Sequence, residues 1–382
     1  MKNNKSFRLG WAFAALCLLS FGIFANIADA QETKCPFADD SVILYSSPTT
    51  LAKAGCAMND AVGFQEELAL VNQFLDKADS EVAKAYEKDD FPKKQYDYLS
   101  EVLRKASGQD SFVRSILVSY FKYVDCVVVA AELPESIDDI KSKGVEGLSL
   151  TLVFNANPGD LDPRKYLESE DLEILKEDDS TLIGKIRIRD GAEIKATIYF
   201  GGTILKDVDK YVIVVGSKAN VEKKIERFQK TSEFVTKRLD VEGLVQENII
   251  KETVFAKAAG FISEKDPLTD PRAKIAVDVL SKIKGVKTRA FASKDGFKKE
   301  VVAEIADETS AQSYVDLANG SLAAVKLVAT SQESLTAEQK LGLEVAGKVV
   351  FKREGSNFVA NSEVSAEQIK AFLKIAKERI GK

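Results

Sequence analysis

Alternation of apolar and polar residues marks several strands that end at tight turns. In "IRIRDGAEIKATIYF" (186–200), strand-like residues run into Asp190-Gly191 and out again. The same pattern returns in "TRAFASKDGFKKEVVAEI" (288–305) and "KVVFKREGSNFVA" (348–360). An acidic residue followed by glycine supplies the positive φ that a tight hairpin turn needs. The sequence therefore predicts β-hairpins in antiparallel sheets that bury one face and expose the other.

A helical period appears nearer the amino terminus. Residues 60–88 are expected to form one long helix, because their apolar residues recur at spacings of three and four. The members of this stripe are Leu68, Val71, Leu75, Ala78 and Val82. Core packing explains the stripe better than a coiled-coil partner surface, since the pattern lasts fewer than three or four heptads.

Several segments recur in the same order along the chain. Each pair combines the same kinds of element: 111–131 with 270–293, 148–167 with 298–315, 183–194 with 346–357, and 211–228 with 358–375. In the last pair the helices are expected to begin at capping residues, Asn220 and Ser365, the second in a capping box with Gln368. An internal duplication accounts for the shared order, and chance similarity of strand and helix patterns is the alternative.

These patterns predict an α+β fold of two related modules. Each module would be an antiparallel sheet with hairpins, covered on one face by helices. The first module is assigned to residues 31–238 and carries an N-terminal helical insertion. The second is assigned to residues 239–382, with the boundary near 236–245.

The first thirty residues have the layout of a secretory signal peptide. Lys2, Lys5 and Arg8 form a basic start, an apolar stretch follows, and 28–30 read Ala-Asp-Ala. This order predicts a signal peptide over 1–30 with cleavage after Ala30. An uncleaved membrane anchor is the alternative, although the apolar run is short for a span. The mature protein is expected to be periplasmic or secreted and to contain no membrane span.

Composition excludes several classes of function. The formal net charge is −5 with mixed signs, which gives no electrostatic footprint for nucleic acid. The chain contains no histidine, so Ser-His-Asp and Cys-His nucleophile systems and imidazole metal ligands are excluded. No catalytic motif was found, and we predict no catalytic residue, no cofactor-binding residue and no cofactor.

Three cysteines remain after the predicted cleavage site. Cys35 and Cys56 would close a short loop at the amino terminus, and export would expose them to oxidising conditions. Cys126 lies in a buried strand pattern and is expected to be a free thiol. The disulfide candidate is therefore Cys35–Cys56, although the sequence alone does not fix the pairing.

A polar loop between two predicted elements offers oxygen ligands of the type that calcium prefers. Its candidate ligands are Asn155, Asn157, Asp160 and Asp162. The loop lacks the glycine and the distal glutamate of an EF-hand. Helix capping by one of the two aspartates explains the same residues, so no metal is predicted and calcium remains the weaker alternative.

The sequence favours an exported, non-catalytic binding or structural protein of the cell envelope. Its partner would be an unknown protein or a small-molecule ligand. One alternative is a carrier of an apolar small ligand between sheet and helices, which predicts an enclosed cavity instead of a filled core. Another is a histidine-independent hydrolase, which predicts two carboxyl groups converging in a cleft, at least one with a raised pKa.

Overall fold

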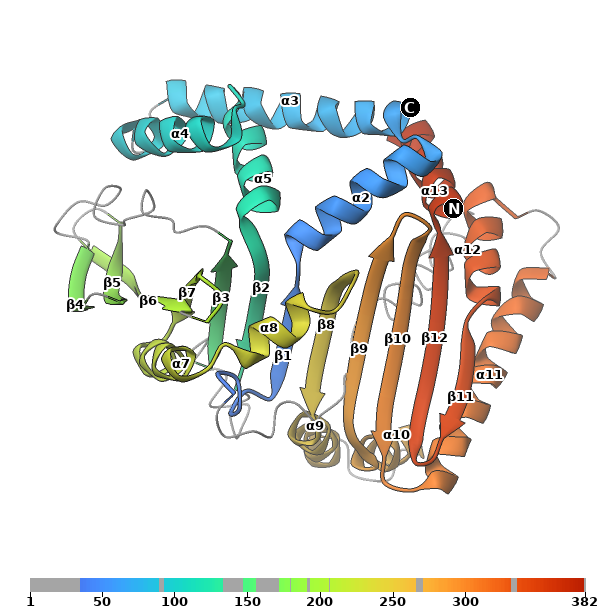
Figure 1. Cartoon of the computed structure of the whole chain (residues 1–382). Helices are drawn as coiled ribbons and strands as arrows, with labels where there is room; N and C mark the ends of the chain where they lie inside the picture. Colours follow the sequence, from blue (N-terminus) through green and yellow to red (C-terminus); the bar gives the residue numbers. More distant parts are fainter. Residues whose placement is uncertain are drawn as a thin grey trace.

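The computed structural model describes residues 35–88, 93–132, 147–155, 172–178, 180–190, 193–205, 207–265, 271–330 and 335–380. In this part of the chain the fold is α+β, as predicted, and twelve strands form one antiparallel sheet (Figure 1). The strands are β1 (Val42–Ser46), β2 (Val124–Ala131), β3 (Leu148–Phe154), β4 (Leu172–Asp178), β5 (Thr181–Asp190), β6 (Glu193–Leu205), β7 (Lys210–Gly216), β8 (Leu244–Lys251), β9 (Ile283–Ser293), β10 (Gly296–Ile305), β11 (Val350–Glu354) and β12 (Asn357–Ser365). The helices are α2 (Pro48–Val62), α3 (Gln65–Glu87), α4 (Lys93–Ser107), α5 (Phe112–Tyr123), α7 (Lys218–Lys230), α8 (Glu233–Leu239), α9 (Glu252–Lys265), α10 (Pro271–Ser281), α11 (Glu308–Thr330), α12 (Ala337–Gly347) and α13 (Ala366–Ile380).

The strand order repeats on either side of a central joint. The order is β11-β12-β10-β9-β8-β1-β2-β3-β7-β6-β5-β4, and β1 pairs antiparallel with β8 at the joint. Outward from the joint, β8-β9-β10-β12-β11 follows the same path as β1-β2-β3-β7-β6. The two predicted modules thus share one continuous sheet instead of building two separate ones. Their origin by duplication stays a prediction.

The strand order shows that one pair of segments matched in the sequence does not correspond in the sheet. By position in the sheet, the hairpin of β11 and β12 corresponds to that of β6 and β7. The sequence had instead matched it to the hairpin of β5 and β6. The Asp-Gly turn between β5 and β6 and the Glu-Gly turn between β11 and β12 therefore stand at places in the two halves that do not correspond. In the turns that are described, Gly296 and Gly355 have φ of 133° and 62°, which favours glycine.

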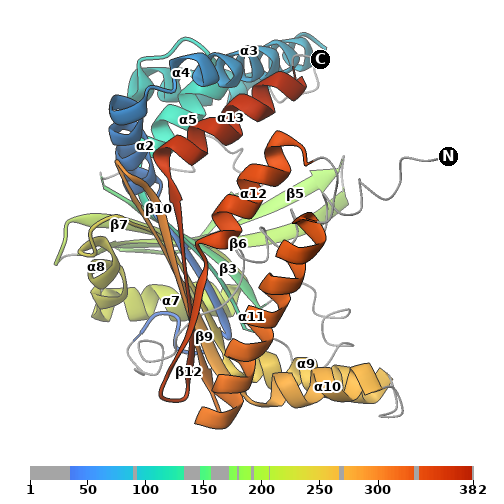
Figure 2. The same cartoon turned by 90° about the vertical axis from the view of Figure 1, so that its right-hand side faces the viewer.

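The helices lie on opposite faces of the two halves. We call the face that carries the side chains of Tyr45, Val214 and Glu247 the α8 face, and the opposite one the α11 face. In the first half, α7 and α8 pack on the α8 face. In the second half, α11 packs on β10, β11 and β12 from the other side, and Figure 2 shows the two groups on either side of the sheet.

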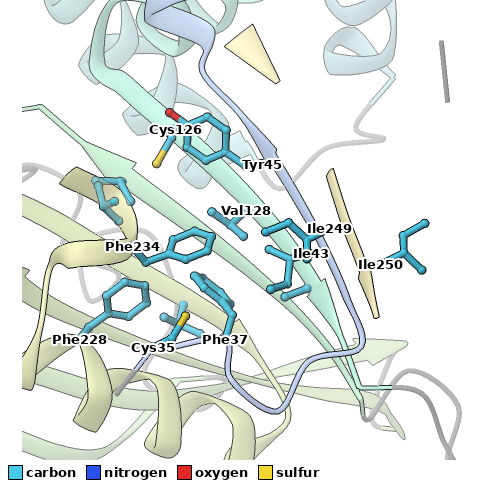
Figure 3. Packing of buried hydrophobic residues seen from close by; sticks show 14 of the residues in the cluster. Cys35, Phe37, Ile43, Tyr45, Cys126, Val128, Phe228, Phe234, Ile249 and Ile250 are labelled. Carbon is cyan, nitrogen blue, oxygen red and sulfur yellow. The ribbon is translucent and has the colours of Figure 1, made fainter. Parts of the chain in front are cut away.

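A large part of the main hydrophobic core lies between the sheet and the helices α7 and α8. Phe37, just before β1, has no exposed surface, and its ring centroid is 5.7 Å from that of Phe228 and 4.6 Å from that of Phe234 (Figure 3). The buried side chains of Ile43 and Tyr45 on β1 extend this core toward the joint. The segment before β1 therefore packs against both α7 and α8 and helps to hold these helices on the sheet.

Local signals fixed some helix starts and missed others. The capping box of α13 is confirmed, because Ser365 N–H donates to Gln368 at 3.1 Å and Gln368 N–H donates to Ser365 Oγ at 3.3 Å. Asn220 was a wrong choice for α7. The helix begins one turn earlier, with Ser217 Oγ accepting the N–H of Asn220 at 3.4 Å.

The N-terminal helical region consists of α2, α3, α4 and α5. The single helix expected over 60–88 is interrupted at Gly63, whose φ of 67° ends α2 before α3 begins. Val71 of the predicted stripe is 46% exposed, so part of that stripe does not pack in the core. No helix of the described residues is both long enough and apolar enough to cross a membrane. The predicted signal peptide, 1–30, lies outside the described residues.

Candidate functional site

Charged side chains form a row across the α8 face of the second half. Glu247 on β8, Arg289 on β9 and Glu300 on β10 stand opposite one another in the strand register. Residues directly across an antiparallel pair share a face, so their side chains are neighbours. Arg289 Nε lies 2.7 Å from Glu247 Oε1. The row therefore alternates in sign from the joint toward the outer strands.

Glu247, at the end of this row beside the joint, is buried, with an exposed fraction of 1%. Arg238 of α8 reaches it from above, with Nε 2.5 Å from Oε2, and Lys287 Nζ lies 3.4 Å from Oε1. Burial raises the pKa of Glu247, but Arg238, Lys287 and Arg289 oppose it, and the pKa is lowered overall. Arg238 also stacks on the ring of Phe234, 3.7 Å from its centroid. This cluster fixes α8 over the joint.

A cavity of 420 Å³ opens at the end of the same sheet region. It exists because β11 pairs with β12 only as far as Val350 and Asn361, whereas β12 continues beside β10 to Ser365. The outer edge of β12 beyond Asn361 is left without a strand beside it in the described residues. The cavity is lined by Phe291, Lys298, Lys299, Glu300, Lys348, Val350, Asn361, Ser362 and Glu363.

The side chains that line this cavity come from both faces of the sheet. The side chains of Lys298 and Glu300 lie on the α8 face, and that of Lys299 lies on the opposite face. Lys299 is buried there, and desolvation lowers the pKa of its ammonium group to about 8. Lys298 Nζ is 3.8 Å from a carboxylate oxygen of Glu363. The cavity thus offers charges of both signs beside the apolar side chains of Phe291 and Val350.

The α11 face of the first half has a different character. Its central side chains are apolar and half-buried: Val127, Val129, Leu150, Leu152, Ile213 and Val215. Leu44 and Leu148 extend the same surface with exposed fractions of 38% and 41%. A sheet face with this composition is suited to apolar contact more than to water.

The structure separates the two cysteines of the predicted disulfide. Cys35 is buried in the main core near Phe37, and Cys56 is exposed on α2. Strand β1 and the first turns of α2 lie between them, so the chain carries Cys56 away from Cys35. Both are free thiols here and the bridge is not formed. Cys126 is a buried free thiol, as its strand pattern indicated.

Only the first of the calcium candidates lies in the described residues. Asn155 donates its side-chain amide to the Lys122 carbonyl at 2.9 Å, and its N–H donates to the Tyr123 carbonyl at 3.0 Å. Asn157, Asp160 and Asp162 lie outside the described residues. Among the described residues, no three Cys, Asp or Glu side chains gather where they could hold a metal ion.

The hydrolase alternative requires carboxyl groups that converge in a cleft. Glu300 and Glu363 both line the cavity. Burial raises the pKa of Asp40, but this carboxyl group lies in the core and is 2.6 Å from Lys224 Nζ. The raised pKa and the two carboxylates that line the cavity therefore occur at different places.

Sequence reasoning missed the Glu247 cluster. A signal was present, because a charged residue in the apolar strand "LVQENII" (244–250) requires a buried partner. The partner could not be read from the sequence. Arg238 lies in the last turn of α8 and is separated from the strand by a short turn, and Arg289 belongs to the next strand of the sheet.

No family model matches the chain, and no curated protein matches it. The crystal structures of TP0453 in forms I, III and IV are similar to it, with 10%, 9% and 9% sequence identity and TM-scores of 0.32, 0.34 and 0.35. The matches cover 90%, 87% and 91% of this chain and 98%, 93% and 99% of the TP0453 chains. So distant a likeness assigns no function to the chain.

Proposed function

We propose that this protein is an exported, non-catalytic binding protein whose ligand occupies the cavity at the end of β11. The cavity carries the proposal because it combines Lys298 and Glu300 with the ring of Phe291 on one sheet face. A few polar groups around an apolar floor are the usual composition of a ligand site. Such a site suits a small ligand or peptide segment with both charged and apolar parts.

Native mass spectrometry of protein purified gently from its exported fraction tests this proposal. We expect extra mass that disappears on denaturation. Its occupancy should fall at least about tenfold in the double variant Lys298→Met, Glu300→Gln, as expected when about 1.4 kcal/mol of binding is lost. Lys294→Met, in the exposed turn between β9 and β10, is the matched control.

Two outcomes would contradict the proposal. A bare native mass at every concentration would argue for a structural role in the envelope. Extra mass that the double variant retains would place the ligand elsewhere. The denatured mass also tests export directly, because cleavage after Ala30 predicts a chain that begins at Gln31.

A carrier of an apolar ligand is the second candidate. The half-buried apolar side chains on the α11 face of the first half support it, with Leu150 and Val215 at their centre. For this function the extra mass should be extractable into organic solvent and should be lost in Leu150→Thr. It should persist in Ile275→Thr, a control at a side chain that is 64% exposed on α10.

A further inference from the structure

The cavity at the end of β11 has an apolar group at each end and polar groups between them. Phe291 on β9 and Val350 on β11 line it from the outer two of four neighbouring strands, β9, β10, β12 and β11 (Figure 1). Neighbouring strands lie about 4.8 Å apart, so the two apolar side chains stand about 14 Å from each other across the sheet. A ligand that contacts both must therefore be extended.

Two half-buried polar side chains between these ends make no hydrogen bond or ion pair with the described residues. They are Glu300 on β10 and Asn361 on β12, which are register partners and therefore neighbours on the α8 face. Lys348, at the same end of the cavity as Val350, donates instead to Gln368 Oε1 at 3.2 Å. The carboxylate and the amide are thus left to bind a ligand.

An acceptor beside a group that both donates and accepts is suited to the backbone of an extended peptide. The carboxylate of Glu300 accepts from N–H groups, and the side-chain amide of Asn361 pairs with both N–H and C=O. In an extended chain, residues i and i+4 point to the same side and lie about 14 Å apart, at about 3.4 Å per residue. This distance matches the separation of Phe291 and Val350, whereas one free amino acid is too short to contact both.

We propose that the cavity binds an extended peptide segment of another exported protein, laid across β9, β10, β12 and β11. Its apolar side chains at positions i and i+4 contact Phe291 and Val350, and the two unpaired polar side chains bind its backbone. The side chain at i+2 lies near Lys298 and Glu363, whose charged groups are 3.8 Å apart, so we expect a polar residue there. This inference rests on the proposed function, because it names the class of ligand for the same cavity.

Affinity selection of synthetic peptides by the mature protein tests the spacing. The probes are two pools of N-acetylated pentapeptide amides with Ser, Lys or Glu at the polar positions. One pool has Leu, Val or Phe at positions 1 and 5, and the other has them at positions 1 and 4, which point to opposite sides of an extended chain. We expect the first pool to be enriched at least tenfold over the second. Equal enrichment, or no retained peptide in either pool, would overturn the inference.

A variant of Asn361 tests the backbone contact. Asn361→Leu keeps the size of the side chain and removes its amide, so the affinity for a selected peptide should fall at least tenfold in isothermal titration calorimetry. Asn357→Leu is the matched control, because this half-buried asparagine is on the same face of β12 but does not line the cavity. Asn361→Asp, which loses the donor, should also bind more weakly. Unchanged affinity in both Asn361 variants would overturn the inference.

Fragmentation of the ligand released in native mass spectrometry separates this inference from the proposed function. A peptide gives a series of backbone fragments, and we expect that series to contain apolar residues four positions apart. A released molecule without peptide bonds, whose binding is still lost in the double variant Lys298→Met, Glu300→Gln, would overturn the peptide and leave the cavity as the binding site.

Discussion

In the first half of the sheet, α7 and α8 cover one face, and the opposite face presents half-buried Val, Leu and Ile side chains. In the second half α11 covers that opposite face, and the side chains on the α8 face include Arg289, Lys298, Glu300 and Glu363. The strand order outward from the joint is nevertheless the same in both halves.

The difference shows that strand order and surface chemistry are set separately. Order follows from backbone pairing, and it is the same in both halves although α2–α5 join β1 to β2 whereas α9 and α10 join β8 to β9. The surface depends on which residue of each alternating pair is apolar, and this can change without moving a strand. A ligand for the first half would therefore be apolar, and one for the second half would carry charge.

The largest expected effect is at the joint between the halves. Glu247→Gln leaves Arg238, Lys287 and Arg289 without their shared carboxylate, so we expect a loss of about 3–5 kcal/mol in the free energy of unfolding. Urea unfolding measures it. Glu304→Gln, at an exposed position on β10, should stay within about 0.5 kcal/mol of wild type. Equal losses of stability at the two positions would show that the buried contacts of Glu247 stabilise the fold no more than an exposed carboxylate does.

The same contact predicts a pH dependence. The pKa of Glu247 is lowered in the folded protein, so its stabilisation is present above the unfolded value, about 4.3. It is lost as pH falls through the lower folded pKa. The gap between wild type and Glu247→Gln should therefore close on acidification. A gap that stays constant down to pH 2 would contradict a charged Glu247.

Two neighbouring valines on β7 compare the two faces of the first half. Val214 has no exposed surface and packs under α7, whereas Val215 is half-buried on the α11 face. Val214→Ala should cost about 2 kcal/mol, since it removes buried methyl groups and leaves a cavity. Val215→Ala should cost less than about 1 kcal/mol, because water already reaches it. Equal costs in chemical denaturation would mean that another molecule covers the α11 face in solution.

Two neighbouring lysines on β10, in the second half, are expected to give the smallest difference in stability. Lys299→Met should stabilise the protein by about 1 kcal/mol at pH 7, because it removes a buried charge that retains some contact with water. Lys298→Met, on the open face, should change stability by less than about 0.5 kcal/mol.

The sign of the pH effect follows from the lowered pKa of Lys299, about 8. The folded state favours neutral Lys299, so burial of this side chain carries no charge penalty above the unfolded pKa, about 10.4. The penalty grows as pH falls and is complete below the folded pKa, about 8. The advantage of Lys299→Met should therefore be largest below pH 8 and vanish near pH 10.5. An advantage independent of pH would show that packing, and not desolvation, explains it.

Sequence by itself determined the parts that depend on near neighbours. The alternation in 288–305 located β9 and β10, and the spacing of Ser365 and Gln368 located the start of α13. These features need only a few adjacent residues, because a turn or a cap is formed by groups one to four positions apart. The division of 60–88 at Gly63 shows the limit of such signals, since one glycine interrupted a period that otherwise continued.

Tertiary structure alone decided how the two halves meet. The pairing of β1 with β8 joins residues about two hundred positions apart, and no local pattern specifies that edge. The same pairing brings Tyr45 beside Glu247 and places Arg238 above both, so the buried polar cluster exists only after the sheet has formed. The cavity likewise depends on β11 stopping short of the end of β12. Such sites are made by contacts distant in the chain, and the sequence shows only that each residue is unusual where it stands.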